Sequence, residues 1–200
     1  NILVIGSEVQ TTQLDYDTEG RGTAIIFGDG AASALIKATD KKDKGILSSH
    51  LHSDGKYIDD LGTVAPNPRI KGLINKQNID NRDHHIFMNG REVFKHAVKR
   101  FPEVILEGLQ HNNLSVDDVK LVIPHQANYR ITQAVQRNLK IDKEKVFSNI
   151  HKFGNTTAAS VGIALSEALE ENKINNNDII VLVAFGAGFY WASTIIKWHN

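Results

Sequence analysis

The apolar positions along the chain follow two periods, and each period predicts one kind of element. Nearly continuous apolar runs that stop at glycine, proline or polar residues predict strands over residues 2–9, 119–123, 146–150, 178–184 and 190–198, and alternation predicts another strand over 46–52. Apolar residues that recur three and four positions apart predict helices over residues 93–109, 128–139 and 156–172. Two further apolar segments, 23–27 and 31–36, flank a glycine turn, and residues 53–85 predict an irregular surface excursion. Strands that alternate with helices predict an α/β fold.

Polar clusters follow two of the predicted strands directly. Leu121–Arg130 runs from a strand into His125, and Ile150–Ser160 runs from the next strand into Asn155. Ligands of open α/β sheets bind outside the carboxyl ends of the strands. A spacing of about thirty residues suits a β-α-β crossover, which would bring His125 and Asn155 to the mouth of one pocket. Each can place an N–H beside a developing negative oxygen. Asn155 also sits at a favoured capping position before a helix, and this structural role explains it equally well.

The composition narrows the class of protein. The chain has 200 residues, of which 41% are hydrophobic and 23% are charged, as in ordinary globular proteins with a real core. It contains no cysteine, which excludes a disulfide scaffold, a thiolate metal site and a thiol nucleophile within this chain. No apolar run approaches the length of a membrane span. We therefore expect a soluble, cytoplasmic protein.

The charge is balanced over the whole chain but not locally. A formal net charge of zero and a pI of about 7.3 argue against nucleic-acid binding. Between Pro124 and Thr156, however, basic residues outnumber Asp142 and Glu144; they are Arg130, Arg137, Lys140, Lys143, Lys145 and Lys152. Such a patch beside the expected pocket suits an acidic partner, and a solvated helix face is an equally good interpretation.

Two smaller motifs have both a chemical and a structural interpretation. His50 and His52 share one face of a predicted strand, which is a spacing compatible with a metal site. With no third ligand nearby in sequence, a half-exposed strand surface is the preferred interpretation. The turn Gly186-Ala187-Gly188 joins the last two strands. It can expose backbone N–H groups to an oxyanion, or it can be a simple hairpin turn.

Four blocks of sequence, taken together, resemble a known family. They are Gly28–Ala31, Pro124–Asn128, Gly154–Ser160 and Ala184–Phe189. Their order and spacing resemble β-ketoacyl-acyl-carrier-protein synthase III, the condensing enzyme that initiates bacterial type II fatty-acid synthesis. The match runs over essentially the whole chain but corresponds to the later part of that family, whose first part carries the nucleophilic cysteine. We therefore expect a C-terminal piece that is inactive alone.

The resemblance implies a thiolase-like α/β fold of two similar halves, each a mixed sheet flanked by helices. Residues 1–38 would then finish the N-terminal half, residues 39–84 would connect the halves and contain one strand, and residues 85–200 would form most of the C-terminal half.

The reaction implied by the resemblance is a two-step decarboxylative Claisen condensation. An acyl group, typically acetyl, moves from coenzyme A to the cysteine, and malonyl-acyl-carrier protein then decarboxylates and attacks it. His125 and Asn155 would stabilise the enolate, and the backbone N–H of Ala187 would stabilise the tetrahedral intermediate. Phe185 and Phe189 would line the acyl pocket. No metal and no separate cofactor are expected, because coenzyme A and phosphopantetheine thioesters are the substrates.

The resemblance also implies where the carrier protein and coenzyme A bind. The residues concerned are Gln126, Ala127, Asn128, Tyr129 and Arg130, with Lys95 and Arg137 as further basic positions. The carrier is acidic and its prosthetic arm bears a phosphate, which guanidinium groups suit. Arg91 stands where many relatives carry asparagine, so that position departs from the family pattern. A homodimer without membrane or nucleic-acid partners is expected.

Two other functions fit the same residues. One is a related thiolase-superfamily synthase of secondary metabolism, against which the block from Gln126 to Arg130 argues mildly. The other is a non-catalytic thiolase-fold subunit or acyl-carrier-binding module. His125 and Asn155 argue against that role, because a scaffold needs neither.

Overall fold

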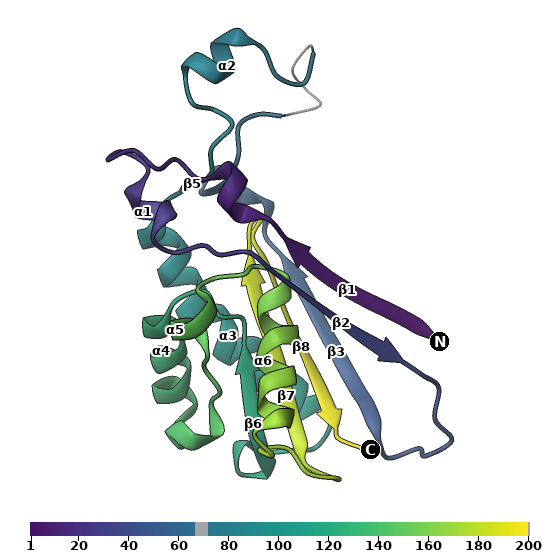
Figure 1. The fold of residues 1–200 in the computed structure, drawn as a ribbon. Helices are drawn as coiled ribbons and strands as arrows, with labels where there is room; N and C mark the ends of the chain where they lie inside the picture. Colours follow the sequence, from purple (N-terminus) through teal and green to yellow (C-terminus); the bar gives the residue numbers. More distant parts are fainter. Residues whose placement is uncertain (67–71, 200) are drawn as a thin grey trace.

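A four-stranded mixed sheet, in the order β3-β8-β7-β6, holds the second part of the chain together (Figure 1). The computed structural model describes residues 1–66 and 72–199. The sheet consists of β3 (Gly45–Ser53), β6 (Val119–Pro124), β7 (Ile179–Gly186) and β8 (Tyr190–Lys197). β6 and β7 are parallel, whereas β8 is antiparallel to β7 and β3. β3 belongs to the segment that the sequence assigns to the connection between halves, and it forms one edge of this sheet, opposite β6.

Helices cover both faces of this sheet. α3 (Gly90–His111) and α4 (Tyr129–Leu139) pack on one face, and α6 (Ala159–Glu170) packs on the other (Figure 1). The side chains of β6 alternate accordingly: Val122 joins Phe101 of α3, while Leu121 and Ile123 join the core under α6. Burial of both faces explains why β6 and β7 read as continuous apolar runs. Pro102 lies inside α3, which nevertheless remains one helix.

The first part of the chain forms a separate antiparallel pair, β1 (Ile2–Glu8) and β2 (Gly30–Ile36). α6 contacts this pair as well as β6 and β7, so one helix packs against both sheets. Gly162 makes the close approach possible, because a Cβ added there would lie 2.5 Å from the Cβ of Ala32. The lack of a side chain at Gly162 therefore sets the distance between α6 and β2.

Two apolar segments do not become strands. Residues 23 and 24 belong to α1 (Arg21–Ala24) and residues 25–27 follow it, whereas 146–150 follow a 3-10 helix at Lys143–Lys145 and lead into α5 (Ile150–Phe153). Each segment forms one isolated bridge: Phe27 pairs with Asn155, and Val146 pairs in parallel with Val122 of β6. The chain then leaves the sheet because the Gln126 side chain accepts hydrogen bonds from Ser148 Oγ and the Asn149 backbone N–H. The predicted strand at 146–150 is wrong.

The described residues of the irregular excursion predicted at 53–85 contain only short elements. They are a 3-10 helix at Gly55–Tyr57, β4 (Leu61–Gly62) and α2 (Lys76–Asp80), with β4 pairing to β5 (Phe87–Met88). Residues 67–71 of this segment lie outside the described part of the chain. Among the described residues, no helix is both long enough and apolar enough to cross a bilayer.

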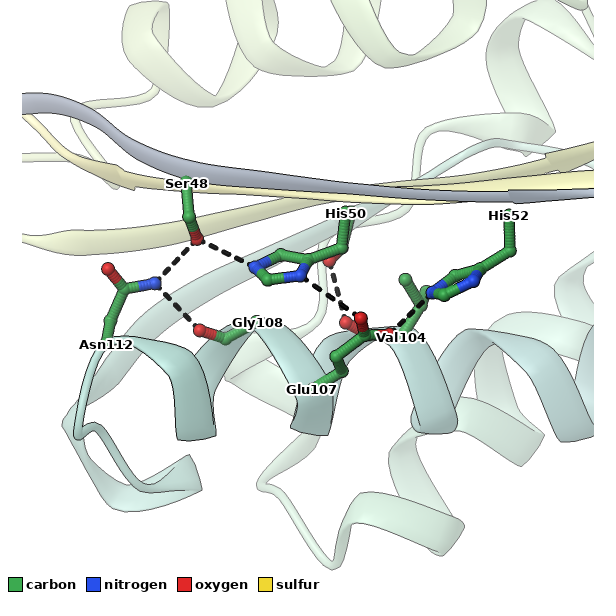
Figure 2. A network of polar contacts seen from close by, with 8 residues as sticks. Ser48, His50, His52, Val104, Glu107, Gly108 and Asn112 are labelled. Carbon is green, nitrogen blue, oxygen red and sulfur yellow. Dashed lines mark hydrogen bonds and ion pairs between the residues drawn. The ribbon is translucent and has the colours of Figure 1, made fainter.

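His50 and His52 bind a carboxylate of α3. Figure 2 shows both rings on β3 pointing toward Glu107, with His50 Nδ1 at 3.3 Å and His52 Nε2 at 2.6 Å from its two carboxyl oxygens. The hydrogen bond with His52 is the main cause that holds the pKa of Glu107 below its usual value. Within the described residues, no three His, Cys, Asp or Glu side chains are arranged to hold a metal ion. The pair therefore fastens the edge strand β3 to α3.

Replacing Gly162 by alanine should destabilise the protein by about 1–3 kcal/mol, since the added methyl group cannot enter the space that Ala32 fills. The better helix propensity of alanine opposes this loss by about 1 kcal/mol. Chemical denaturation of Gly162→Ala, Ala32→Gly and the double variant would measure the effect. The double variant should be more stable than the sum of the two single changes predicts; simple additivity would contradict direct packing of α6 on β2.

Candidate active site

A cavity of about 990 Å³ opens where β6 and β7 end and where α3 and α4 begin. Residues from widely separated segments line it, among them Phe27, Arg91, His125, Asn155 and Phe185. The structure therefore brings His125 and Asn155 to one cavity. The route differs from a crossover between two strands, because the segment before Asn155 leaves the sheet after Val146.

His125 follows directly after Pro124, the last residue of β6. Its backbone N–H donates to the Val183 carbonyl at 2.7 Å, which extends the ladder between β6 and β7 by one bond. The imidazole is partly buried, and its Nδ1 lies 2.6 Å from Ser160 Oγ. Burial lowers the pKa of His125 from 6.5 to about 4. The ring is therefore neutral near pH 7 and offers one N–H donor.

Asn155 is held by its backbone and by its side chain. Its N–H donates to Ile26 O and its carbonyl accepts from Gly28 N–H, each at 2.9 Å, so it pairs with the chain around Phe27. Its Oδ1 accepts the Thr157 N–H at 2.9 Å. Because only an oxygen can accept that bond, the opposite end of the amide is the donor NH2 group.

The Asn155 side chain does not cap α6, the helix that follows it. α6 begins at Ala159, and no side chain caps it. The bond to Thr157 instead closes a tight turn before the helix. Thr157 itself adopts φ 44°, a region in which β-branched residues are rare. Such backbone strain is typical of functional sites, where surrounding contacts hold it in place.

Gln126 faces inward, away from the cavity. It is 1% exposed, and its amide donates to the Pro124 and Phe147 carbonyls while accepting from Ser148 and Asn149. Its side chain therefore supports the loop and does not reach the surface, which corrects its expected contact with a carrier. Ala127, Asn128 and Arg130 line the cavity, and Tyr129 is exposed beside a second groove. Asn128 Oδ1 also caps α4 by accepting the Arg130 N–H at 2.9 Å.

The turn between β7 and β8 brings Ala187 to the cavity, together with Phe185. Gly188 is the residue of this turn with positive φ, at 133°, whereas Ala187 is not in that region. An alanine in the middle position is therefore compatible with the turn. Phe189 is 1% exposed and does not line the cavity. It packs behind Phe185 and stacks on Tyr57, so its expected place in the acyl pocket wall needs correction.

Basic residues lie at the rim of the cavity. Arg91 on α3 and Arg130 on α4 both line it, and both are exposed. Lys95 and Arg137 are also exposed but lie away from the cavity wall, and Lys95 is paired with Glu92 at 3.2 Å. From the sequence, Arg91 departs from the family pattern and Ser160 has no expected role. Ser160 belongs to the block that contains Asn155, and this proximity was the available signal.

Comparison with known proteins supplies the family. Two family models match: "3-Oxoacyl-[acyl-carrier-protein (ACP)] synthase III C terminal" over residues 109–198, and "3-Oxoacyl-[acyl-carrier-protein (ACP)] synthase III" over residues 1–55. The chain belongs to the 3-oxoacyl-[acyl-carrier-protein] synthase III family.

Curated synthases III from two bacteria resemble the chain closely. The protein of Clostridioides difficile (strain 630) is 44% identical over 198 residues, and that of Caldanaerobacter subterraneus subsp. tengcongensis is 42% identical over 200 residues. These alignments cover 99% and 100% of this chain but 58% and 59% of the relatives. The chain thus spans less than two thirds of the length of the synthases that it matches.

Solved synthase III structures share the fold. The enzyme of Aquifex aeolicus VF5 superposes with a TM-score of 0.85 at 37% identity, covering 98% of this chain and 57% of that one. The enzyme of Pseudomonas aeruginosa PAO1 gives 0.87 at 32% identity, covering 99% and 59%. The expected thiolase-like α/β fold, with a mixed sheet flanked by helices, is confirmed. The division into residues 1–38, 39–84 and 85–200 stays a prediction.

The His125 imidazole of this synthase III chain should stay neutral down to about pH 5, because burial disfavours its charged form. NMR titration of the ring carbons should give a pKa of about 4. The unfolded chain binds this proton near pH 6.5, so native stability should fall as the pH drops from about 6.5 to 4. His125→Gln should lose that part of the pH dependence. A native pKa near 6.5 would contradict the proposed burial.

Proposed function

We propose that this chain is the C-terminal part of a β-ketoacyl-acyl-carrier-protein synthase III. The enzyme would join an acyl-coenzyme A primer, typically acetyl-coenzyme A, to malonyl-acyl-carrier protein by decarboxylative Claisen condensation. One observation carries the proposal: His125 and Asn155 line the same cavity, and an internal hydrogen bond holds each side chain by its other polar atom. Both therefore have an N–H left for a ligand.

Decarboxylation explains why two neutral donors suit this cavity. When the malonyl C–C bond breaks, carbon dioxide leaves and the electron pair moves onto the thioester oxygen as an enolate. Fixed N–H groups aimed at that oxygen stabilise the charge without having to reorganise. A neutral imidazole is a weak acid, so His125 can donate a hydrogen bond without protonating the enolate carbon. The enolate carbon then attacks the acyl thioester and forms the new C–C bond, and the resulting tetrahedral intermediate collapses by breaking the acyl C–S bond and releasing the sulfur as a thiolate.

The acyl thioester requires a nucleophile from outside this chain, which contains no cysteine. We assign that cysteine to the part of the synthases III that the chain does not span. The N–H of Ala187 is the candidate donor to the tetrahedral intermediate at the cysteine, because this turn residue lies at the cavity. Phe185 supplies an apolar wall for the acyl chain, and Phe189 supports it from behind. The chain alone should be inactive.

The rim suits an acidic carrier protein and the phosphate of its prosthetic arm. Arg130 lines the cavity, and no carboxylate among the described residues pairs with it. Asn128 and Ala127 lie beside it and can contact the pantetheine arm. Further along the same face of α4, Arg137 extends the positive surface, and Lys95 on α3 extends it as well. No cofactor is proposed beyond the coenzyme A and phosphopantetheine thioesters. The homodimer and the cytoplasmic location stay predictions.

The alternatives have less support. A non-catalytic acyl-carrier-binding module needs no oriented N–H donors, yet both His125 and Asn155 are held in place by specific bonds. A secondary-metabolism synthase would use the same chemistry with another acceptor. The two curated relatives described above carry the name synthase III.

Removing either donor should impair the decarboxylation half-reaction selectively. In the full-length protein, His125→Ala and Asn155→Ala should each lower the rate of malonyl-carrier decarboxylation by about 10²–10³-fold. Acylation of the cysteine by acyl-coenzyme A is the internal control and should change little, because it forms no enolate. Equal loss of both half-reactions would contradict the assigned roles.

Charge reversal at the rim should affect the carrier substrate more than coenzyme A. Arg130→Glu in the full-length protein should raise KM for malonyl-carrier protein by roughly tenfold or more, since like charges repel across a docking surface. Lys41→Glu is the matched control: it changes the net charge equally at an exposed position away from the cavity. An equal rise of KM in both variants would disprove a local contact.

A further inference from the structure

Ser160 is a buried hydroxyl with two polar neighbours on the loop that carries His125. It is the second residue of α6 and is 2% exposed. Its Oγ lies 3.3 Å from the backbone nitrogen of Gln126 and 2.6 Å from Nδ1 of His125. Among the described residues, these are the two hydrogen-bond partners of this hydroxyl.

The protons of this group can be assigned from the bonding capacity of each atom. The Gln126 backbone N–H can only donate, so Ser160 Oγ accepts that bond. The serine hydrogen then has one acceptor within reach, which is Nδ1 of His125. If Nδ1 carried the imidazole hydrogen, the buried serine hydrogen would have no partner, which buried polar groups avoid. Ser160 therefore donates to Nδ1, and Nδ1 is unprotonated.

A neutral imidazole carries its single hydrogen on one of its two nitrogens. With Nδ1 acting as acceptor, the hydrogen is on Nε2, across the ring from Ser160. No described residue is a partner of Nε2, and the ring lines the cavity. The Nε2–H group is thus the donor available to a ligand.

We propose that Ser160 is a positioning residue that fixes His125 in the Nε2-protonated tautomer, so that its N–H is directed at the substrate oxygen. This role rests on the proposed enolate chemistry, in which His125 must donate. It also couples the two donors, since Asn155 lies five residues before Ser160 in the same segment. One stretch of chain then orients the Asn155 amide through Thr157 and the His125 ring through Ser160.

The tautomer can be read directly, without an activity measurement. In full-length protein labelled with ¹⁵N in its histidine rings, the His125 spectrum near pH 7 should show a protonated Nε2 and an unprotonated Nδ1. Ser160→Ala, which removes the hydroxyl and little volume, should add the Nδ1-protonated form. Ser160→Thr keeps the hydroxyl and should restore the native pattern. A wild-type spectrum with protonated Nδ1 would overturn the proposal, as would a Ser160→Ala spectrum identical to wild type.

Kinetics separate positioning from structural support. Ser160→Ala should lower malonyl-carrier decarboxylation by roughly tenfold or more while leaving cysteine acylation close to wild type, because a ring in the wrong tautomer presents no donor. Ser160→Thr should recover most of the rate. Equal loss of both half-reactions, not rescued by threonine, would overturn the positioning role. If the tautomer responds as expected but the wild-type enzyme does not decarboxylate malonyl-carrier protein, the proposed function fails and the role of Ser160 in setting the tautomer stands.

Discussion

The buried amide of Gln126 is the contact on which the candidate site depends. It ties the loop after β6 to residues 147–149 through three hydrogen bonds, one donated to Phe147 and two accepted from Ser148 and Asn149, and its amide also donates to Pro124 at the end of β6. A side chain that is 1% exposed must satisfy its polar atoms internally, so these bonds fix the path of both segments. One segment delivers His125 and the other continues to Asn155. The sheet itself holds this segment only through the bridge between Val146 and Val122, so the Gln126 bonds direct the chain beyond that point.

The site is organised before any ligand enters. Each donor is held by a bond on its far side: His125 by Ser160, and Asn155 by the Thr157 N–H. Desolvation keeps the imidazole neutral, with a pKa of about 4. Oriented neutral N–H groups in a partly enclosed cavity are suited to stabilise charge that develops on oxygen, since they need not move during the reaction. Close packing of α6 on both sheets keeps the segment that carries Asn155 in place.

The sequence predicts the regular elements well where their period is long or their apolar run is continuous. The helix over 93–109 corresponds to α3, that over 128–139 to α4, and the last two strands to β7 and β8. The short run 146–150 misleads, because five apolar-rich residues fit a strand and a helix start equally well. The hydrogen bond that Gln126 Oε1 accepts from the Asn149 backbone N–H decides between them, and no pattern in the sequence reveals it.

The placement of the two candidate donors is predicted from the sequence better than the residues that support them. His125 and Asn155 do line one cavity, as expected, although by another route. Gln126 and Phe189 prove to be internal. Residue type alone does not tell which polar or aromatic side chain faces the cavity and which is buried behind it. The role of Ser160 follows from the short distance between its Oγ and Nδ1 of His125, which the sequence does not give.

The central claim is that His125 and Asn155 hydrogen-bond to the thioester oxygen of the malonyl substrate. Isotope-edited infrared spectroscopy of a ¹³C-carbonyl-labelled, non-decarboxylating malonyl-thioester analogue bound to the full-length enzyme tests it most directly. The account predicts that the thioester carbonyl stretch moves to lower frequency on binding, and that His125→Ala and Asn155→Ala each remove part of this change. A carbonyl frequency equal to that in water, or one that neither substitution alters, would contradict it.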